Sequence, residues 1–516
     1  MKKNSVMHLE NGRMPVATPE SVGVKSESIQ AFFDAVKQEN IPLHSIQIVR
    51  HGKLICDAVA KPYTHESFHR IFSAAKGVVA TAVLLCIQDG LFGIDDPVLP
   101  LLPKEDLPED LDPGWQKLTV YHLLTMTDGH MEDAFFKMYS GSTCWTRTFF
   151  EVPLACEPGT QFCYDMGAQY IMNEIVAGAT GKDLGTFMKE RVWDKIGANV
   201  KWRYTEPEGH FFSSSIEMQP DGLTRMALLY LQEGEWDGEQ IIDRELMEFA
   251  ALPQGPSTIA YTCGITEETL DDIAGYGLHM WRNTSGGYRF CGGQGQLGII
   301  YPEYDMAVST LAALDDCDRI DELFDRYVLH KCWARPQKVN EFAAKKLART
   351  IRNFTMGVPD ASDCSSTAAK VFGKTYAFAE NKIGLKTVCF EFDEDRAVIR
   401  TTADNGEKTF AVGLRDEWAA NKGYIMSDHE DGWLPDLDRN HTYDTMDTLA
   451  TGGWASKDCF EFVVRGNAIN CEFRFFCTFD GNDLEVNART TEHKPPVAFM
   501  GESSDKPGYD LYASVK

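Results

Sequence analysis

The sequence has no long apolar run, no C-x-x-C pair and few basic residues. A transmembrane helix needs roughly 20 consecutive apolar residues, and no stretch approaches that length. Fifty Lys and Arg stand against 77 Asp and Glu, a net charge of −27, which argues against nucleic acids and anionic membrane surfaces as partners. We therefore predict no nucleic-acid partner and no membrane partner.

The 14 cysteines follow no regular spacing, which argues against a disulfide framework. The first residues, "MKKNSVMHLENGRMP", contain two lysines but no apolar run behind them, unlike a secretion signal. Scattered cysteines in a large chain without such a signal are typical of reduced thiols in the cytosol. The sequence predicts a soluble, cytoplasmic protein, and 516 residues are too many for one core.

The first 335 residues mix helical and strand patterns. Apolar spacing predicts a helix in "SESIQAFFDAVKQEN", capped by Ser26 or Ser28, a β-hairpin in "HSIQIVRHGKLICDAVA", and a helix over 73–88. Further helical segments precede three expected sequential strands, "YGLHMWRN", "GYRFCGGQGQLGIIYP" and "DMAVSTLAAL", and a closing helix. This order predicts an α/β (α+β) domain, an antiparallel sheet flanked by helices with a large helical insertion.

The remainder of the chain has a different character. Residues 336–370 read as a connecting helix followed by a linker rich in turn formers. From 371 to 516, short alternating runs are separated by Gly, Asn and Asp, which predicts an all-β barrel or sandwich. We therefore expect a first domain over 1–335 and a smaller β-rich domain over 371–516.

One stretch, "HESFHRIFSAAKG" (65–77), contains two catalytic signatures. His65-Glu66-Ser67-Phe68-His69 matches H-E-x-x-H, which binds zinc when both histidines lie on one helical face with a third ligand. No third histidine follows at the metzincin spacing, and the next carboxylates come after the predicted helix. The favoured interpretation is two polar histidines leading into a buried helix, so we predict no metal and no cofactor.

The other signature is S-x-x-K, formed by Ser73 and Lys76. Spacing alone is weak support, because Ser503-Ser504-Asp505-Lys506 matches equally well in a polar stretch that we expect to be loop. Context separates them: Ser73 lies where a helix should begin, and Lys76 is the only charged residue between Ser73 and Gln88. An ordinary lysine is neutral at pH 7 in about one molecule in a few thousand. Burial lowers its pKa, and the neutral amine could then accept the serine proton.

A third motif, Gly293-Gln294-Gly295-Gln296-Leu297-Gly298, fits the dinucleotide fingerprint G-x-G-x-x-G. That fingerprint requires a helix directly after the glycines. The following "IIYPEYDMAVSTL" predicts strand, turn and strand instead, so we reject a nucleotide site.

With these residues in place, the first two-thirds of the chain resembles the serine β-lactamase/penicillin-binding-protein-like hydrolases. This superfamily includes class C β-lactamases, β-lactamase-type carboxylesterases, D-aminopeptidases and aminohexanoate-oligomer hydrolases. The resemblance rests on ordered segments over about 300 residues: "HRIFSAAKGVVATAVLLCIQDGLFGIDDPV", "KLTVYHLLTMTDGH", "FCYDMGAQYIMNEIVAGATGKDLGTFMKERVWDKIGA" and "GGQGQLGIIYPEYDMAV". It implies a β-lactamase/transpeptidase-like fold.

The resemblance also implies residue roles. Ser73 would be the acylated nucleophile and Lys76 its proton partner, and Tyr164 occupies the place of the tyrosine in the family's Y-x-N motif. Without the resemblance, Tyr164 would read as a buried core tyrosine. The oxyanion hole would pair the Ser73 N–H with a backbone N–H near Gly293 or Gln294.

Two positions depart from the family pattern. Met166 replaces the asparagine of Y-x-N, and Cys291-Gly292-Gly293 stands where K-T-G or H-x-G is usual, although the alignment there has more than one solution. The cation that binds a substrate carboxylate is then absent, which disfavours β-lactamase and D,D-peptidase activity. Cys291 as an alternative nucleophile is disfavoured, since His279 is the only histidine near it in the sequence.

The sequence therefore predicts a serine hydrolase that cleaves a small-molecule ester or amide through an acyl-enzyme on Ser73. The alternatives are a peptidase or amidase of the D-aminopeptidase type, a catalytically silent binding protein of the same fold and, more distantly, a zinc hydrolase. The β-rich domain resembles barrel-like appendages behind some of these hydrolases. Two roles are open for it: shielding the mouth of the active site and mediating a homo-oligomer.

Overall fold

The chain divides into two compact units, which are described separately. The first comprises Met1–Val59, Arg70–Ala312 and Asp316–Phe354, and the second Ala60–His69, Ala313–Asp315 and Thr355–Lys516. The computed structural model describes residues 5–139, 142–202, 213–254, 274–314, 316–356, 361–381, 384–403, 406–415, 417–423, 447–466, 472–490 and 509–515. The domain boundaries that the sequence suggests at residues 335 and 371 remain predictions.

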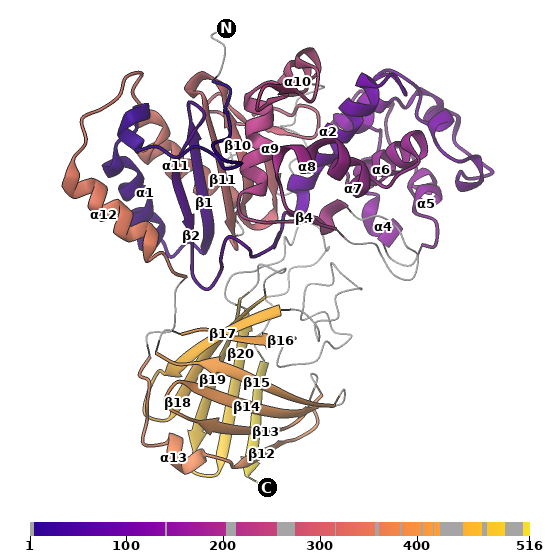
Figure 1. Ribbon diagram of the computed structural model, residues 1–516. Coiled ribbons are helices and arrows are strands. Elements are labelled where there is room, and N and C mark those ends of the chain that lie inside the picture. Colours follow the sequence, from indigo (N-terminus) through magenta and orange to yellow (C-terminus); the bar gives the residue numbers. More distant parts are fainter. Residues whose placement is uncertain are drawn as a thin grey trace. The chain divides into compact units, whose positions relative to one another are not determined.

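The first unit is built on a six-stranded antiparallel sheet (Figure 1). The strand order is β2-β1-β11-β10-β9-β8. Their bounds are Leu43–Arg50 (β1), Lys53–Val59 (β2), Trp281–Arg282 (β8), Tyr288–Gly292 (β9), Gln296–Tyr301 (β10) and Met306–Ala312 (β11). Every residue of β1 and β11 is buried, as expected for central strands covered on both faces.

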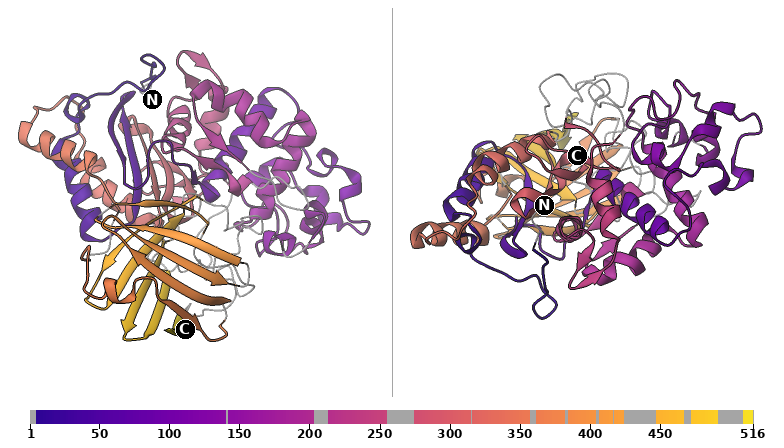
Figure 2. Two further views of the ribbon diagram at one scale, coloured as in Figure 1. Left: turned by 60° about the horizontal axis from the view of Figure 1, so that its bottom comes forward. Right: turned by 90° about the horizontal axis from the view of Figure 1, so that it is seen from above.

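Helices cover the two faces of this sheet (Figures 1 and 2). On one face lie α1 (Ser26–Gln38) and α11 (Cys317–Tyr327), with α12 (Glu341–Arg352) packed against α1. On the other, α9 (Gly222–Leu231) packs on β10 and β11, and α2 (Ala75–Gln88) meets β9. The helix α1 forms because Ile29, Phe32 and Val36 recur at helical spacing and are buried together. The predicted sheet flanked by helices is confirmed.

A helical region between α2 and α9 forms the predicted insertion, drawn in purple in Figure 1. α2 is apolar on every side and buried over most of its length, packing against α6 and α7. The helices of this region are α3 (Val120–Leu124), α4 (Phe135–Tyr139), α5 (Trp145–Glu151), α6 (Met166–Thr180), α7 (Leu184–Met188) and α8 (Asp194–Ile196); α10 (Arg244–Ala251) follows α9. Five further strands are two residues long: β3 (His69–Arg70), β4 (Val200–Lys201), β5 (Glu217–Met218), β6 (Glu235–Trp236) and β7 (Glu239–Gln240).

Two local predictions were wrong. The N-cap of α1 is Lys25 rather than a serine, because the buried Glu20 carboxylate accepts the Ser26 N–H at 2.8 Å and takes over the capping role. The predicted single strand in "GYRFCGGQGQLGIIYP" is two strands, β9 and β10. Gln294 (φ 66°) and Gly295 (φ 85°) adopt left-handed conformations and close a three-residue hairpin loop between them.

The two rejected motifs fail on geometry. The H-E-x-x-H segment forms turns followed by β3, so its histidines do not lie one helical turn apart on a single face. The glycine-rich segment leads into β10 and not into a helix. The other S-x-x-K match, at Ser503, lies outside the described residues.

The second unit is a barrel rather than a sandwich (Figure 1). Among the described residues, nine strands follow one another in the order β15-β14-β13-β12-β21-β20-β19-β18-β17, and a parallel bridge from Gly413 to Thr451 joins β15 to β17 and closes the ring. The strands are β12 (Thr375–Phe378), β13 (Leu385–Phe392), β14 (Arg396–Ala403), β15 (Gly406–Gly413), β16 (Ala419–Lys422), β17 (Asp447–Trp454), β18 (Cys459–Gly466), β19 (Glu472–Asp480), β20 (Asp483–Thr490) and β21 (Tyr509–Val515), with a short helix α13 (Ala368–Val371). Alternate residues of β14 are buried, which matches the alternating sequence pattern.

Among the helices of the described residues, none combines the length and the apolarity that crossing a bilayer requires.

Candidate active site

Ser73 lies in a 3-10 turn, Phe72–Ala74, that leads directly into α2. Phe72 has a φ of 48°, and its ring faces the guanidinium of Arg70 at 5.2 Å. A left-handed conformation is uncommon for a residue other than glycine and is enriched at functional sites. This turn leaves Ser73 half-buried at the start of the helix. The Ser73 side chain makes no capping hydrogen bond to α2, whose N-cap residue is Ala74.

Lys76 is brought onto Ser73 by the first turn of α2. Its Nζ donates a hydrogen bond to Ser73 Oγ at 3.1 Å, and the side chain is 1% exposed. Burial lowers the pKa of Lys76 to about 8, against the opposing charges of Asp133 and Asp165. The site therefore holds an amine that is neutral in a substantial fraction of molecules near neutral pH.

Tyr164 packs on the same lysine. Lys76 Nζ lies 4.3 Å from the centre of the Tyr164 ring, a cation–π contact, and Trp281 stacks on the ring at 5.9 Å between centroids. Phe162 and Tyr276 contact Trp281 edge-on, at 5.8 and 4.9 Å. The three residues predicted to be catalytic thus lie together, with an aromatic wall beside them.

A buried acidic cluster, which sequence reasoning missed, holds the segment that carries Tyr164. Asp165 Oδ1 accepts the N–H groups of Gly167 at 2.6 Å and Ala134 at 3.1 Å, while its Oδ2 lies 2.9 Å from His130 Nδ1. Asp133 Oδ1 accepts the Met166 N–H at 3.0 Å. These bonds fix the start of α6, where Met166 is half-buried, against residues 130–134.

The protonation of this cluster differs from that of exposed carboxyls. Burial raises the pKa of Asp133, and burial together with the charge of Asp128 raises the pKa of Asp165 well above its usual range. The ligand atoms of Asp128, His130 and Asp165 lie within 4.8 Å of one another, a spacing that could hold a metal ion. Because Asp165 Oδ1 accepts two backbone N–H groups and Oδ2 is hydrogen-bonded to His130, we interpret the cluster as support for the Tyr164 segment.

The end of β9 forms the other side of the nucleophile turn. A Cβ on Gly292 would lie 2.1 Å from the Ile71 carbonyl oxygen, so only glycine allows this close approach. Gly293 is exposed and a Cβ there would meet open space, whereas Gln294 is buried. Cys291 precedes them and is half-buried. Three of the four predicted binding or oxyanion residues, Cys291, Gly293 and Gln294, thus flank the glycine that touches the Ser73 turn, whereas the fourth, Met166, begins α6.

The buried side chain of His279 contacts the backbone of Lys76. It is 3% exposed, and its ring nitrogens lie 3.3 Å from the Lys76 carbonyl oxygen and 3.1 Å from that of Leu123. Burial, and then the charge of Lys76, lower the pKa of His279 to about 3. Its ring is therefore neutral and faces backbone carbonyls, which does not suit it to activate Cys291.

The chain is similar to several known proteins. The family described as "Beta-lactamase" matches residues 29–322, more than half of the chain. The lovastatin esterase of Penicillium rubens is 26% identical over 171 residues, 29% of this chain and 42% of that protein. Esterase EstB of Burkholderia gladioli is 25% identical over 197 residues, 33% of this chain and 49% of that protein. The chain thus spans about half the length, or less, of the curated relatives that it matches.

A solved structure is similar over a larger share of the chain. The octameric penicillin-binding protein homologue from Pyrococcus abyssi covers 94% of this chain and 99% of its own, with a TM-score of 0.45 and 14% sequence identity.

Proposed function

Because the chain belongs to the β-lactamase family, we propose that it is a serine hydrolase that cleaves an ester or amide bond through an acyl-enzyme on Ser73. The observation that carries the proposal is the hydrogen bond of 3.1 Å from Lys76 to Ser73, made by a lysine whose burial lowers its pKa to about 8. An amine so placed can accept the serine proton as the oxygen attacks a carbonyl carbon.

The proposed reaction uses these groups in turn. Neutral Lys76 takes the proton from Ser73 Oγ, which bonds to the carbonyl carbon of the substrate. The developing oxyanion is held by the Ser73 N–H and by a backbone N–H at Gly293 or Gln294. Tyr164, against Lys76, passes a proton to the leaving group. Water then attacks the acyl-enzyme with the same groups in reverse, releasing the acid and restoring Ser73.

The residues around the serine favour an ester over a β-lactam. Met166 and Cys291-Gly292-Gly293 provide neither an amide nor a cation for a substrate carboxylate, whereas Tyr164 and Trp281 offer apolar surface. Two of the relatives are named esterases. We therefore propose an uncharged ester as the preferred substrate class.

A substrate panel tests this proposal. We expect hydrolysis of p-nitrophenyl butyrate by the wild type, much slower cleavage of alanine p-nitroanilide and none of a chromogenic cephalosporin, with Ser73→Ala inactive throughout. Faster cleavage of the amino-acid anilide would support a D-aminopeptidase-type amidase instead. Ester hydrolysis that survives Ser73→Ala would contradict the proposal, and inactivity of the folded wild type would support a binding protein.

We also propose a cytoplasmic location, since 14 cysteines without a pairing pattern suit a reducing compartment. Fractionation of the source cells, followed by immunodetection, tests it. Homo-oligomerisation, which the sequence leaves open, is tested by light scattering of the full chain.

A further inference from the structure

Two cysteines from different elements meet beside the candidate site. Cys291 lies on β9 and Cys317 is the first residue of α11, and their side chains are hydrogen-bonded to each other. Both residues are half-buried. The catalytic steps proposed above use neither thiol, so the pairing has no role in them.

The hydrogen bonds that Cys317 accepts favour its thiolate, whereas its protonated S–H donates to the Gly292 carbonyl oxygen at 3.6 Å. Its Sγ accepts the Gly295 N–H at 3.1 Å and the hydrogen bond from Cys291. The hydrogen bond to Cys291 lowers the pKa of Cys317 and, for the same reason, raises that of Cys291 well above its usual range. Burial and the carboxylate of Asp318 oppose both thiolates, and the buried guanidinium of Arg289 favours them. A thiolate is the form that attacks an oxidant.

We propose that Cys291 and Cys317 form a reversible disulfide when the protein meets a peroxide, and that this bond slows acylation of Ser73. The effect on rate rests on the proposed function, whereas the formation of the bond does not.

The chemistry balances with hydrogen peroxide as the oxidant. The Cys317 thiolate attacks one peroxide oxygen, the O–O bond breaks, and a sulfenic acid and hydroxide result. The sulfur of Cys291 then attacks the Cys317 sulfur, the S–O bond breaks, and water leaves with the thiol proton. Overall, two thiols are oxidised to one disulfide while one peroxide is reduced to two water molecules. A thiol reductant reverses the reaction by exchange.

The bond would disturb the loop that carries the candidate oxyanion donor. Cys317 Sγ now contacts both ends of that loop, the Gly295 N–H at 3.1 Å and the Gly292 carbonyl oxygen at 3.6 Å. A disulfide requires the two sulfur atoms to approach to about 2.05 Å, which draws Cys317 Sγ toward Cys291 and away from these two groups. Gly293 and Gln294 lie between them, so the donor N–H loses its position. Removal of such a donor costs about 10²–10³ in rate.

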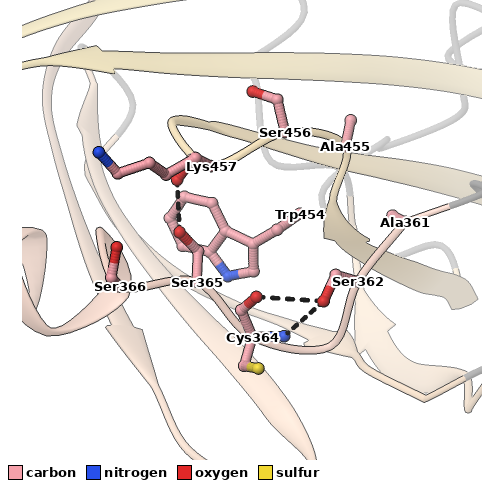
Figure 3. A pocket seen from close by; sticks show the side chains of 9 residues that line it. All are labelled: Ala361, Ser362, Cys364, Ser365, Ser366, Trp454, Ala455, Ser456 and Lys457. Atoms are coloured by element: carbon pink, nitrogen blue, oxygen red, sulfur yellow. Dashed lines mark hydrogen bonds between the residues drawn. The ribbon is translucent and has the colours of Figure 1, made fainter.

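The chain offers a control thiol in the second unit. Cys364 is exposed and lines a pocket of about 600 Å³ with serine hydroxyls, Trp454 and Lys457 (Figure 3). Ser362 Oγ donates to the Cys364 carbonyl oxygen at 3.2 Å, a backbone contact that does not involve the thiol. Cys364→Ser therefore removes an accessible thiol without touching the pair.

The experiment treats the reduced full-length wild type, Cys317→Ser and Cys364→Ser with hydrogen peroxide. Intact mass and non-reducing peptide mapping report the oxidation state and pairing of the cysteines. The rate of Ser73 labelling by a fluorophosphonate, measured before and after oxidation, reports the reactivity of the candidate nucleophile. We expect the wild type and Cys364→Ser to lose two hydrogen masses, to yield a peptide joining residues 291 and 317, and to label about tenfold or more slowly until dithiothreitol is added. Cys317→Ser should give no such peptide and no reversible slowing.

Three outcomes would overturn the inference: a cross-link between other cysteines, over-oxidation of Cys317 without a cross-link, or a mapped 291–317 bond with an unchanged labelling rate. If the reduced wild type does not label at Ser73, the proposed function fails. Peptide mapping still decides, independently of labelling, whether the bond forms.

Discussion

Replacing Lys76 by arginine should stop the reaction of Ser73 with electrophiles while keeping a cation in place. Lys76 is 1% exposed and donates to Ser73 Oγ at 3.1 Å. Burial, the largest influence on this group, lowers its pKa to about 8. A guanidinium has a pKa above 12, so arginine retains the charge and hydrogen-bonding capacity but cannot accept the serine proton.

The size of the effect follows from the fraction of neutral amine. At pH 7 a pKa of about 8 leaves about one lysine in ten neutral, whereas the ordinary value near 10.4 leaves about one in a few thousand. Burial thus increases the supply of base about 200-fold. Because the deprotonated form is the active one, the acylation rate should rise about tenfold between pH 6 and 7 and level off above pH 8. Lys76→Arg should lower the rate by about 10²–10⁴.

The assay is the second-order rate of labelling by a fluorophosphonate, followed by intact mass from pH 6 to pH 10. The exposed Lys117, changed to arginine, is the matched control and should behave as the wild type. A wild-type rate that keeps rising to pH 10 would show that burial does not lower the Lys76 pKa in solution. A Lys76→Arg variant that labels at the wild-type rate would refute Lys76 as the base.

Three further predictions concern the surroundings of this pair. Tyr164→Phe removes the hydroxyl but keeps the ring that packs on Lys76 and Trp281. Ester hydrolysis should therefore fall about 10²–10⁴-fold while the melting temperature stays unchanged. Retained activity would remove Tyr164 from the mechanism. Gly292→Ala places a Cβ 2.1 Å from the Ile71 carbonyl oxygen, so it should cost about 1–3 kcal/mol in urea unfolding and slow Ser73 labelling at least tenfold. Unchanged unfolding free energy and Ser73 labelling in Gly292→Ala would show that β9 does not lie in close contact with the turn.

The third of these concerns acid stability: burial lowers the pKa of His279 to about 3 from an ordinary value near 6.5. Between those values only the unfolded chain binds the proton, so this residue should lower the free energy of unfolding by about 2 kcal/mol from pH 7 to pH 5. His279→Gln should shrink that loss relative to the exposed control His8→Gln, measured by urea unfolding at both pH values. An equal loss of unfolding free energy in both variants would contradict the lowered pKa of His279.

The fold was largely predictable because each element has a strong local pattern. The alternation around His51-Gly52 gives the β1–β2 hairpin, and the apolar run after Ser73 gives α2. The split of β9 from β10 was missed, since it depends on a left-handed conformation at Gln294, a residue type that gives no turn signal. The choice of barrel over sandwich depends on the bridge between β15 and β17, a long-range contact with no local signature.

The candidate site was predictable where residues are adjacent in the sequence. Ser73 and Lys76 share one helical turn, and their contact follows from that spacing. The remote partners were not evident: Asp133 and His130 support the Tyr164 segment, and Cys317 pairs with Cys291. The fold alone brings these side chains together. An aspartate directly before an apolar helical segment, as Asp165 is before Met166, is a helix-cap signal that could have drawn attention to the cluster.

The most direct test of the account is the intact mass of the full-length protein after fluorophosphonate treatment, compared among the wild type, Ser73→Ala and Ser503→Ala. Ser503 belongs to the other S-x-x-K match and serves as the control for the motif alone. One adduct on the wild type and on Ser503→Ala, mapped to Ser73, with none on Ser73→Ala, is the predicted result. An adduct that persists in Ser73→Ala, or its absence from the folded wild type, would contradict the claim that Ser73 is an activated nucleophile.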